Sequence, residues 1–305
     1  MGKIELLVRE QETGMRLDQF LARNVENSSR SVIQQLIRDG HVTLEGQLIA
    51  QPSHRLRAGQ GIVLNLPKGG EILDPRGIEL DVLYEDESIV VINKRCGVVV
   101  HPGAGENQTT LVEGLLVERD LPVDDDPVRP GIVHRLDKDT SGTIVIAKTR
   151  EAMRSLKEQF ASRRVHKLYA AVVEGIVSEE EGLIDAPIGR DQGNPRRMAI
   201  TARGKSAQTE FCVVERRGSS SLLLVHLLTG RTHQIRIHMR YIGHSILGDT
   251  LYGHAGNRLM LHAWRLGFLH PKSEEYLSFT APLPAEFLLP DERSLDEMAR
   301  AHYSL

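Results

Sequence analysis

One short, glycine-bounded segment carries the residues best suited to chemistry, Gly131-Ile-Val-His-Arg-Leu-Asp-Lys-Asp-Thr-Ser-Gly142. Its Asp137 is flanked by two cations, Arg135 and Lys138, which favour the ionised carboxylate. An ionised carboxylate can act as a nucleophile or stabilise positive charge that develops on a sugar carbon. On this segment alone, an ordinary surface ion pair explains Asp137 equally well.

A second segment supplies cations that can serve this carboxylate, Leu228-Thr-Gly-Arg-Thr-His-Gln-Ile-Arg-Ile-His-Met239. If it is extended, its alternation places Arg236 and His238 on one face and its isoleucines on the other. His233 and His238 then face apart, which argues against a metal-binding histidine pair. An arginine facing a carboxylate is the stronger interpretation, because a guanidinium stays charged and can bind both oxygens. An arginine on a solvated sheet face is the alternative.

A third segment, Lys167-Leu-Tyr-Ala-Ala-Val-Val-Glu-Gly175, adds an aromatic side chain beside basic residues. Aromatic residues make up 4% of the chain, so stacking on a nucleobase has few positions to use. Tyr169, near Arg163 and Arg164 in sequence, is one of them, and such stacking contributes about 1–3 kcal/mol per base. By itself, a tyrosine packed in the core is the simpler explanation.

Short apolar runs separated by turns must position these segments. The runs suited to buried strands are residues 89–94, 143–148, 169–173 and 222–227. Between the second and third run, Met153, Leu156 and Phe160 share one face of an amphipathic helix. Because strands dominate, we expect an α+β domain over residues 78–300, built on a mixed or antiparallel sheet. Asp137 then lies in a turn that leads directly into a strand, a common place for functional residues.

Residues 15–70 are expected to form a separate small α-β module. Two helical stretches, 16–23 and 32–37, precede a hairpin whose turn holds Glu45 and Gly46. A further strand follows, and residues 67–70 are typical of a linker.

Composition excludes several classes of protein. The chain has 305 residues, of which 40% are hydrophobic and 26% are charged. No apolar run approaches the roughly 20 residues of a membrane span. The two cysteines, Cys96 and Cys212, lie far apart in sequence, which favours free thiols in a reducing compartment. We therefore expect a cytoplasmic protein.

Charge is segregated along the chain although the net charge is only -3. Residues 129–170 hold ten Lys and Arg against four Asp and Glu, and residues 190–205 hold five against one. Residues 216–240 hold five Arg and no acid. This segregation predicts a basic face suited to RNA or DNA, unless the three stretches are solvated faces that never converge.

Four motifs together resemble those of the RluA-type pseudouridine synthases in order and spacing. They are residues 81–103, His134-Arg-Leu-Asp-Lys-Asp-Thr-Ser-Gly142, Lys167-Leu-Tyr-Ala170 and Thr229-Gly-Arg-Thr-His-Gln-Ile-Arg-Ile-His-Met239. In addition, residues 30–46 resemble the S4 RNA-binding domain, so the likeness covers nearly the whole chain. One departure is Arg95-Cys96, where the family usually has proline after Asn-Lys.

The resemblance implies an isomerase that converts uridine in RNA to pseudouridine without metal or cofactor. Asp137 matches the catalytic aspartate, Tyr169 the tyrosine that stacks on the target base, and Arg236 the arginine that pairs with the aspartate. Arg135 matches the residue inserted where the uridine is flipped out. Three further residues are expected to contact the substrate: His134, Arg231 and His233.

Within the family, the chain is most similar to the synthases of the large ribosomal subunit. The expected partner is therefore 23S rRNA or a large-subunit precursor. Two alternatives stay open, the same chemistry on tRNA or another RNA, and a ribosome-associated RNA-binding protein without catalysis. Whether Asp137 attacks the sugar or removes a sugar proton also stays open.

Overall fold

The computed structural model describes residues 3–25, 30–38, 40–65, 77–102, 108–124, 126, 128–194, 197–287 and 293–303. The described chain forms two compact units. The first consists of Met1–Glu79, Val99–Ile132 and Lys148–Arg150, and the second of Leu80–Val98, Val133–Ala147 and Glu151–Leu305. The expected domain limits, 15–70 and 78–300, stay a prediction.

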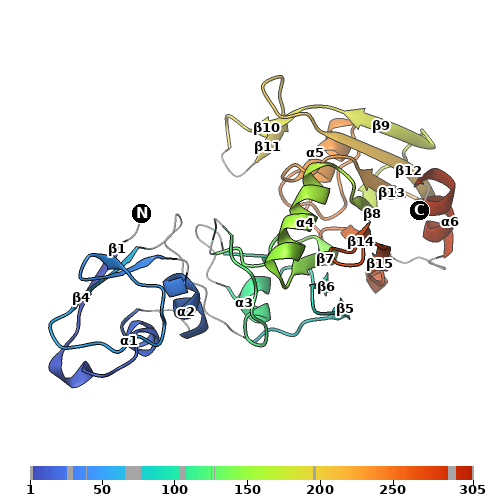
Figure 1. Ribbon diagram of the computed structural model, residues 1–305. Helices are drawn as coiled ribbons and strands as arrows, with labels where there is room; N and C mark the ends of the chain where they lie inside the picture. Colours follow the sequence, from blue (N-terminus) through green and yellow to red (C-terminus); the bar gives the residue numbers. More distant parts are fainter. Residues whose placement is uncertain are drawn as a thin grey trace. The chain divides into compact units, whose positions relative to one another are not determined.

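The first unit contains an antiparallel sheet, four-stranded in its described part, and two helices (Figure 1). The strands are ordered β1 (Lys3–Leu7), β4 (Gly61–Asn65), β2 (Val42–Leu44) and β3 (Gln47–Leu48). The helices are α1 (Leu17–Asn24) and α2 (Arg30–Arg38), preceded by a 3₁₀ turn at Glu10–Glu12. Apolar side chains of both helices, among them Phe20 and Ile33, pack with Ile62 and Leu64 of β4 into one core. The short helix α3 (Leu111–Leu115) also belongs to this unit.

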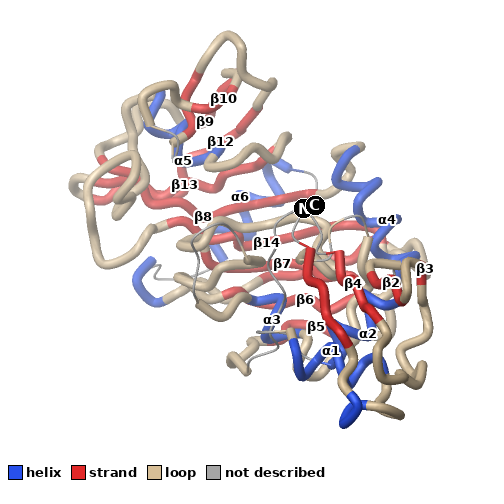
Figure 2. Tube along the Cα trace, turned by 90° about the vertical axis from the view of Figure 1, so that its left-hand side faces the viewer, coloured by secondary structure: helices blue, strands red, loops and turns tan. Residues whose placement is uncertain are grey.

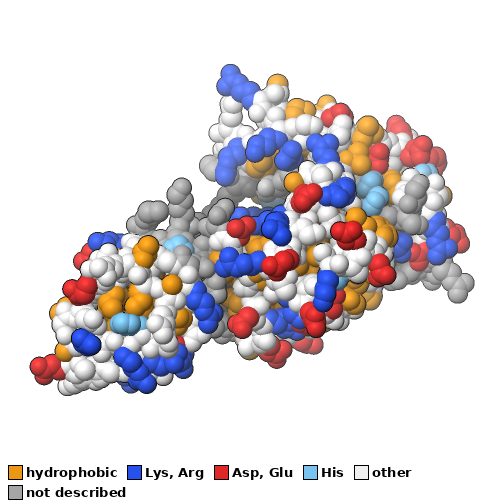
Figure 3. Space-filling model, in the orientation of Figure 1, with side chains coloured by type: hydrophobic (Ala, Val, Ile, Leu, Met, Phe, Trp, Pro, Cys, Tyr) orange, Lys and Arg blue, Asp and Glu red, His pale blue; other side chains and the backbone are white. Residues whose placement is uncertain are grey.

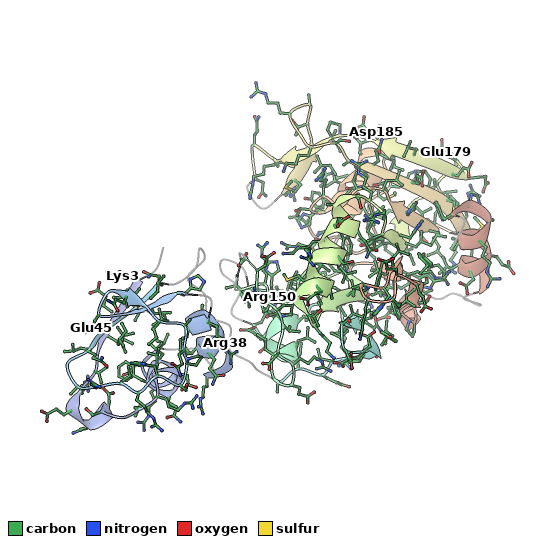
Figure 4. The ribbon with its side chains drawn as sticks, in the orientation of Figure 1. Lys3, Arg38, Glu45, Arg150, Glu179 and Asp185 are labelled. Atoms are coloured by element: carbon green, nitrogen blue, oxygen red, sulfur yellow. The ribbon has the colours of Figure 1, made fainter. Side chains whose placement is uncertain are left out.

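The hairpin predicted in this unit is confirmed. Glu45 and Gly46, between β2 and β3, have φ of 51° and 78°, so both adopt the left-handed conformation of a two-residue hairpin turn. Figure 4 labels Glu45 at this turn. The expected linker, residues 67–70, lies outside the described residues.

The second unit is built on a mixed sheet that has nine strands among the described residues (Figure 2). The order is β5 (Val82–Glu85), β6 (Ile89–Lys94), β7 (Ser141–Ala147), β14 (Leu261–Leu269), β8 (His166–Glu174), β13 (Ser220–Leu227), β12 (Gln208–Arg217) and β9 (Glu181–Asp185), with β15 (Tyr276–Thr280) paired to β14. β7 and β14 pair in parallel, and the other pairs are antiparallel. The predicted α+β class and the four predicted strands are confirmed.

Among the described residues, three helices and a separate two-stranded hairpin accompany this sheet. The helices are α4 (Arg150–Ala161), α5 (Gln234–Tyr241) and α6 (Arg293–Tyr303), with a 3₁₀ turn at Ala285–Phe287. As predicted, α4 buries Met153 and Leu156, which pack against Ile89 and Val145 of the sheet. The hairpin pairs β10 (Ile188–Arg190) with β11 (Met198–Ile200). No helix in the described ranges is long and apolar enough to cross a membrane.

The extended interpretation of residues 228–239 is wrong, because α5 begins at Gln234. Every residue from Gln234 to Met239 is buried, and only Arg240 and Tyr241 at the end of the helix are exposed, so polar and apolar positions do not separate into a buried and a solvent face. Without a polar face, the helical period is invisible in the sequence, and alternating isoleucines suggest a strand instead. His238 lies inside this helix with both ring nitrogens engaged, by Thr209 Oγ1 at 2.8 Å and the Ala186 carbonyl at 3.0 Å.

Candidate active site

A cavity of about 420 Å³ in the second unit brings the three chemically suggestive segments together. Its walls come from the loop before β7, the end of α4, strand β8 and residues 227–236. All seven residues singled out from the sequence line it: His134, Arg135, Asp137, Tyr169, Arg231, His233 and Arg236.

The loop that carries Asp137 is fixed on one side by a buried lysine of β6. Lys94 is 1% exposed, and its Nζ donates to the carbonyl oxygens of Arg95, Val98 and Lys138 at 2.8–3.0 Å. Burial lowers the pKa of Lys94 to about 8, so the ammonium is still charged at neutral pH. Because Lys138 follows Asp137 directly, this cation holds the peptide next to the carboxylate.

The other side of the loop is fixed where it becomes β7. Ser141 Oγ lies 2.8 Å from His262 Nδ1 and accepts a hydrogen bond from Arg258 Nη2 at 2.7 Å. Gly142 has φ of 112°, and a Cβ there would lie 2.2 Å from the carbonyl oxygen of Ala263. Only glycine allows this approach of β7 to β14, so the strand that follows Asp137 is rigidly placed.

The carboxylate of Asp137 itself is held loosely. Its Oδ2 lies 3.6 Å from Arg236 Nη1 and 4.0 Å from His233 Nε2, and the side chain is 19% exposed. Both distances exceed the range of a good hydrogen bond. Within the described part of the chain, no hydrogen bond reaches the carboxylate, and no other acidic side chain lines the cavity. Asp137 therefore keeps its oxygens available.

Arg236 has a stronger partner than Asp137, one that sequence reasoning missed. Its Nε and Nη2 each donate to a carboxylate oxygen of Asp249 at 2.7 Å, and Asp249 is fully buried. Asp249 also accepts the backbone N–H of Leu251 and of Tyr252 at 2.9 Å. Burial alone would raise the pKa of Asp249, but the hydrogen bonds from Arg236 bring it below its usual value. The pair fixes the guanidinium with Nη1 toward Asp137.

His233 approaches Asp137 from the start of α5. It adopts φ of 56°, the left-handed conformation, at the N-cap of the helix. Its Nδ1 lies 2.8 Å from the hydroxyl of Tyr252, whose oxygen accepts the Met198 N–H at 2.8 Å. The hydroxyl proton is thus left for Nδ1, and we assign the imidazole proton to Nε2, which faces Asp137. Burial lowers the pKa of His233, which favours the neutral ring.

Gln234 ties this segment to the sheet. Its Oε1 accepts from Thr229 Oγ1 at 2.7 Å and from the Arg231 N–H at 3.0 Å. Its Nε2 donates to the Gln208 carbonyl and to Thr209 Oγ1, both at 2.9 Å. All four hydrogen-bonding positions of the amide are used, so residues 229–234 form a fixed loop.

His134 shapes the cavity as a neutral ring. Its Nε2 accepts the N–H of Val145 at 3.0 Å, and the ring stacks on Phe160 with a centroid distance of 4.5 Å. Burial lowers the pKa of His134 to about 3, with a smaller effect from the charge of Lys167.

Tyr169 presents its ring to the cavity from β8 and is 8% exposed. Among the residues described, its hydroxyl has no hydrogen-bond partner. Burial, together with the charge of Asp137, raises the pKa of Tyr169, so the phenol stays protonated at neutral pH.

Positive charge dominates the remaining lining. Five cations border the cavity: Arg135, Arg163, Lys167, Arg231 and Arg236. Two of the three basic sequence segments, 129–170 and 216–240, therefore converge here. The third segment forms the β10–β11 hairpin, over which Lys and Arg side chains gather in Figure 3. Such a surface favours polyanions.

Comparison with known proteins agrees with this architecture. Residues 88–241 match the family model described as RNA pseudouridylate synthase, and residues 15–62 match the S4 domain.

Three similar proteins illustrate the match. An uncharacterised RNA pseudouridine synthase of Bacillus subtilis, YlyB, is 42% identical over 293 residues, which are 94% of this chain and 96% of the relative. The ribosomal large subunit pseudouridine synthase D of Zymomonas mobilis is 38% identical, over 93% of this chain and 95% of its own length. The solved structure of human RNA pseudouridylate synthase domain containing 1 is 28% identical, covers 73% of this chain and 95% of its own, and has a TM-score of 0.59. The chain belongs to the RNA pseudouridylate synthase family of isomerases.

Proposed function

We propose that the protein converts specific uridines of 23S rRNA to pseudouridine and that Asp137 is the catalytic carboxylate. The rRNA substrate is supported by the Zymomonas relative, which is named for the large ribosomal subunit. The S4 match over residues 15–62 supports an RNA-binding role for the first unit. The catalytic assignment depends on one observation, that Asp137 is the acidic side chain of the cavity lining in the described structure. The proposal includes action in the cytoplasm.

The reaction needs a carboxylate beside the sugar. The N1–C1′ bond of uridine breaks, the uracil rotates and a C5–C1′ bond forms, while C5 loses a proton and N1 gains one. An ionised Asp137 can attack C1′ or remove a sugar proton, and either route uses a free oxygen lone pair. A carboxylate that accepts few hydrogen bonds is the more reactive in both roles, because hydrogen bonds stabilise its charged form. The loose contacts of Asp137, at 3.6 Å and 4.0 Å, fit this need.

Arg236 and His233 orient the carboxylate in this scheme. Arg236, fixed by Asp249, sets a permanent positive charge on one side of Asp137. His233, neutral and tied to Tyr252, presents an N–H to the same oxygen. Both remain close enough to restrain the carboxylate without engaging its lone pairs fully.

Tyr169 and Arg135 act on the base in this scheme. The ring of Tyr169 stacks on the uracil, which contributes about 1–3 kcal/mol. Its protonated hydroxyl can donate a hydrogen bond to a uracil carbonyl. Arg135, exposed on the Asp137 loop, fills the place of the uridine once the base has left its stack.

Pseudouridine mapping tests the substrate assignment. The purified full-length protein is incubated in parallel with unmodified 23S rRNA and with total tRNA transcripts. We expect new pseudouridines at defined positions of 23S rRNA and none in tRNA. Modification of tRNA alone would overturn the rRNA assignment, and tight rRNA binding without any modification would overturn catalysis.

A further inference from the structure

Lys167 is a buried cation that the reaction scheme above does not use. It lies on β8 two residues before Tyr169, so both side chains project from the same face of the strand. Lys167 is 9% exposed and lines the cavity. Among the described residues, its ammonium has no hydrogen bond and no ion pair. Because this ammonium is not fully buried, a group that enters the cavity can reach it and compensate its reduced hydration.

Lys94 shows how this chain otherwise buries a lysine. Its ammonium donates to three backbone carbonyls, which satisfy all three of its protons. Lys167 is buried almost as deeply but points into a cavity open to ligands. The difference indicates that Lys94 stabilises the fold, whereas Lys167 is available to bind a ligand.

A second cation, the exposed Arg163, lines the same cavity as Lys167. Arg163 follows α4 and lines the cavity with Phe160 and the neutral His134. The charge of Arg163, after the larger effect of burial, lowers the pKa of Lys167 to about 8, which places the two cations within electrostatic reach. Two like charges repel each other unless an anion lies between them.

The backbone conformation at Arg163 is also unusual for a residue other than glycine. Its φ is 60°, a conformation that glycine usually adopts just after a helix. The N–H of Arg163 donates to the Phe160 carbonyl at 3.3 Å and that of Arg164 to the Gln159 carbonyl at 2.9 Å, so the end of α4 fixes the position of Arg163. Of the four non-glycine residues with positive φ in the described structure, Arg163 and His233 both line the cavity.

We propose that Lys167 and Arg163 form a subsite for a phosphodiester of the RNA, next to the uridine held between Asp137 and Tyr169. The inference rests on the proposed function, because a flipped nucleotide carries its own phosphates into the cavity with it. Phosphate oxygens accept charge-assisted hydrogen bonds from lysine and arginine, and such contacts fix the register of a bound nucleic acid. The subsite sets how far the uridine enters.

RNA binding in the absence of turnover tests this subsite. The dissociation constant of a 23S rRNA transcript is measured over a range of salt concentrations for Asp137→Asn, alone and combined with Lys167→Met or Arg163→Met. We expect each added change to weaken binding at low salt by about 10- to 100-fold, since hydrogen bonds to charged groups are stronger than those between neutral groups. The slope of log Kd against log salt should fall by about 0.7 for the lost phosphate contact.

The matched control is Arg154→Met in the same Asp137→Asn background. Arg154 is exposed on α4 and does not line the cavity, so its replacement removes an equal charge outside the cavity. Its effect on Kd should stay within about twofold. Binding by the Lys167→Met protein with the affinity and slope of the control would overturn the subsite.

Thermal unfolding separates a ligand role from a structural one. Removing an unpaired buried charge should leave the Tm of Lys167→Met unchanged or raised, and Lys167→Arg should retain RNA binding. A lowered Tm with unaltered RNA binding would overturn the proposal in favour of a structural lysine. Inorganic phosphate, compared with chloride at equal ionic strength, identifies the anion source. A Tm gain that depends on Lys167, without an effect on RNA binding, would assign the subsite to free phosphate and overturn the phosphodiester.

The two proposals can fail separately. Weaker RNA binding by Lys167→Met would support the subsite even if mapping finds no pseudouridine. Conversely, normal mapping with unchanged binding would overturn the subsite and leave the proposed function intact.

Discussion

Asp18 in the first unit and Asp137 in the second are both carboxylates beside arginine side chains, yet their surroundings differ. Asp18, on α1, is fully buried and accepts hydrogen bonds from Arg16, Arg30 and Gln34 at 2.6–3.0 Å. Burial would raise its pKa, but these hydrogen bonds lower it well below the usual range. Asp137 is partly exposed, and its nearest cation is 3.6 Å away.

The difference separates a carboxylate that holds a fold from one that can react. A carboxylate with every lone pair engaged contributes to stability and is a poor nucleophile or base. A carboxylate with restrained but free oxygens is suited to chemistry. Asp249 belongs with Asp18, because Arg236 and two backbone N–H groups satisfy it. The same contrast holds for the buried lysines, Lys94 and Lys167.

Of the two fully hydrogen-bonded carboxylates, Asp249 should give the larger effect when it is replaced by Asn. Its loss should lower both the free energy of unfolding and the reaction rate. The substitution removes the charge that holds Arg236, whose side chain is 7% exposed. We expect the free energy of unfolding to fall by about 3–5 kcal/mol. The single-turnover rate should fall by roughly 10²–10³-fold, because a misplaced Arg236 no longer orients Asp137. Urea unfolding and single-turnover assays measure the two effects, and a wild-type rate would show that Asp249 has no part in the site.

Asp18→Asn should affect stability alone. Its arginine partners are 33% and 47% exposed and can be solvated once the pair is broken, so we expect a loss of about 2–3 kcal/mol. The chemical step at saturating RNA should stay within about twofold of wild type, since Asp18 does not line the cavity. A rate loss comparable to that of Asp249→Asn would contradict the conclusion that Asp18 stabilises the fold without a part in the reaction.

Acidification should lower the free energy of unfolding, because the folded protein keeps His134 neutral and hydrogen-bonded. Its folded pKa of about 3 lies below the unfolded value near 6.5, so the unfolded state binds the extra proton first. Stability is therefore lost as pH falls below about 6.5, by about 2 kcal/mol at pH 5 from this residue.

The control for this effect is His134→Gln, whose amide oxygen can still accept the Val145 N–H. Urea unfolding at pH 7 and pH 5 should show the wild type losing about 2 kcal/mol more than this variant. Equal losses would mean that His134 does not stay neutral in the folded protein.

Local sequence patterns were sufficient to predict the positions of those site residues that lie on a regular strand or on the loop before one. Asp137 before β7 and Tyr169 on β8 were placed correctly because turns and apolar runs are local signals. Asp249 was missed, since nothing local marks which of 41 acidic residues faces a buried arginine. The three backbone carbonyls that accept from Lys94 could not be predicted from the sequence for the same reason. Helix α5 was misread because its first six residues, polar and apolar alike, are all buried and show no helical period.

We propose that the open carboxylate of Asp137 performs the reaction. The most direct test is single-turnover pseudouridine formation on 23S rRNA by wild type, Asp137→Asn and the control Asp185→Asn, an exposed carboxylate of β9 labelled in Figure 4. We predict a rate loss of about 10⁴-fold or more for Asp137→Asn, with Tm and RNA affinity retained, and a wild-type rate for the control. A rate for Asp137→Asn within about tenfold of wild type would contradict the account.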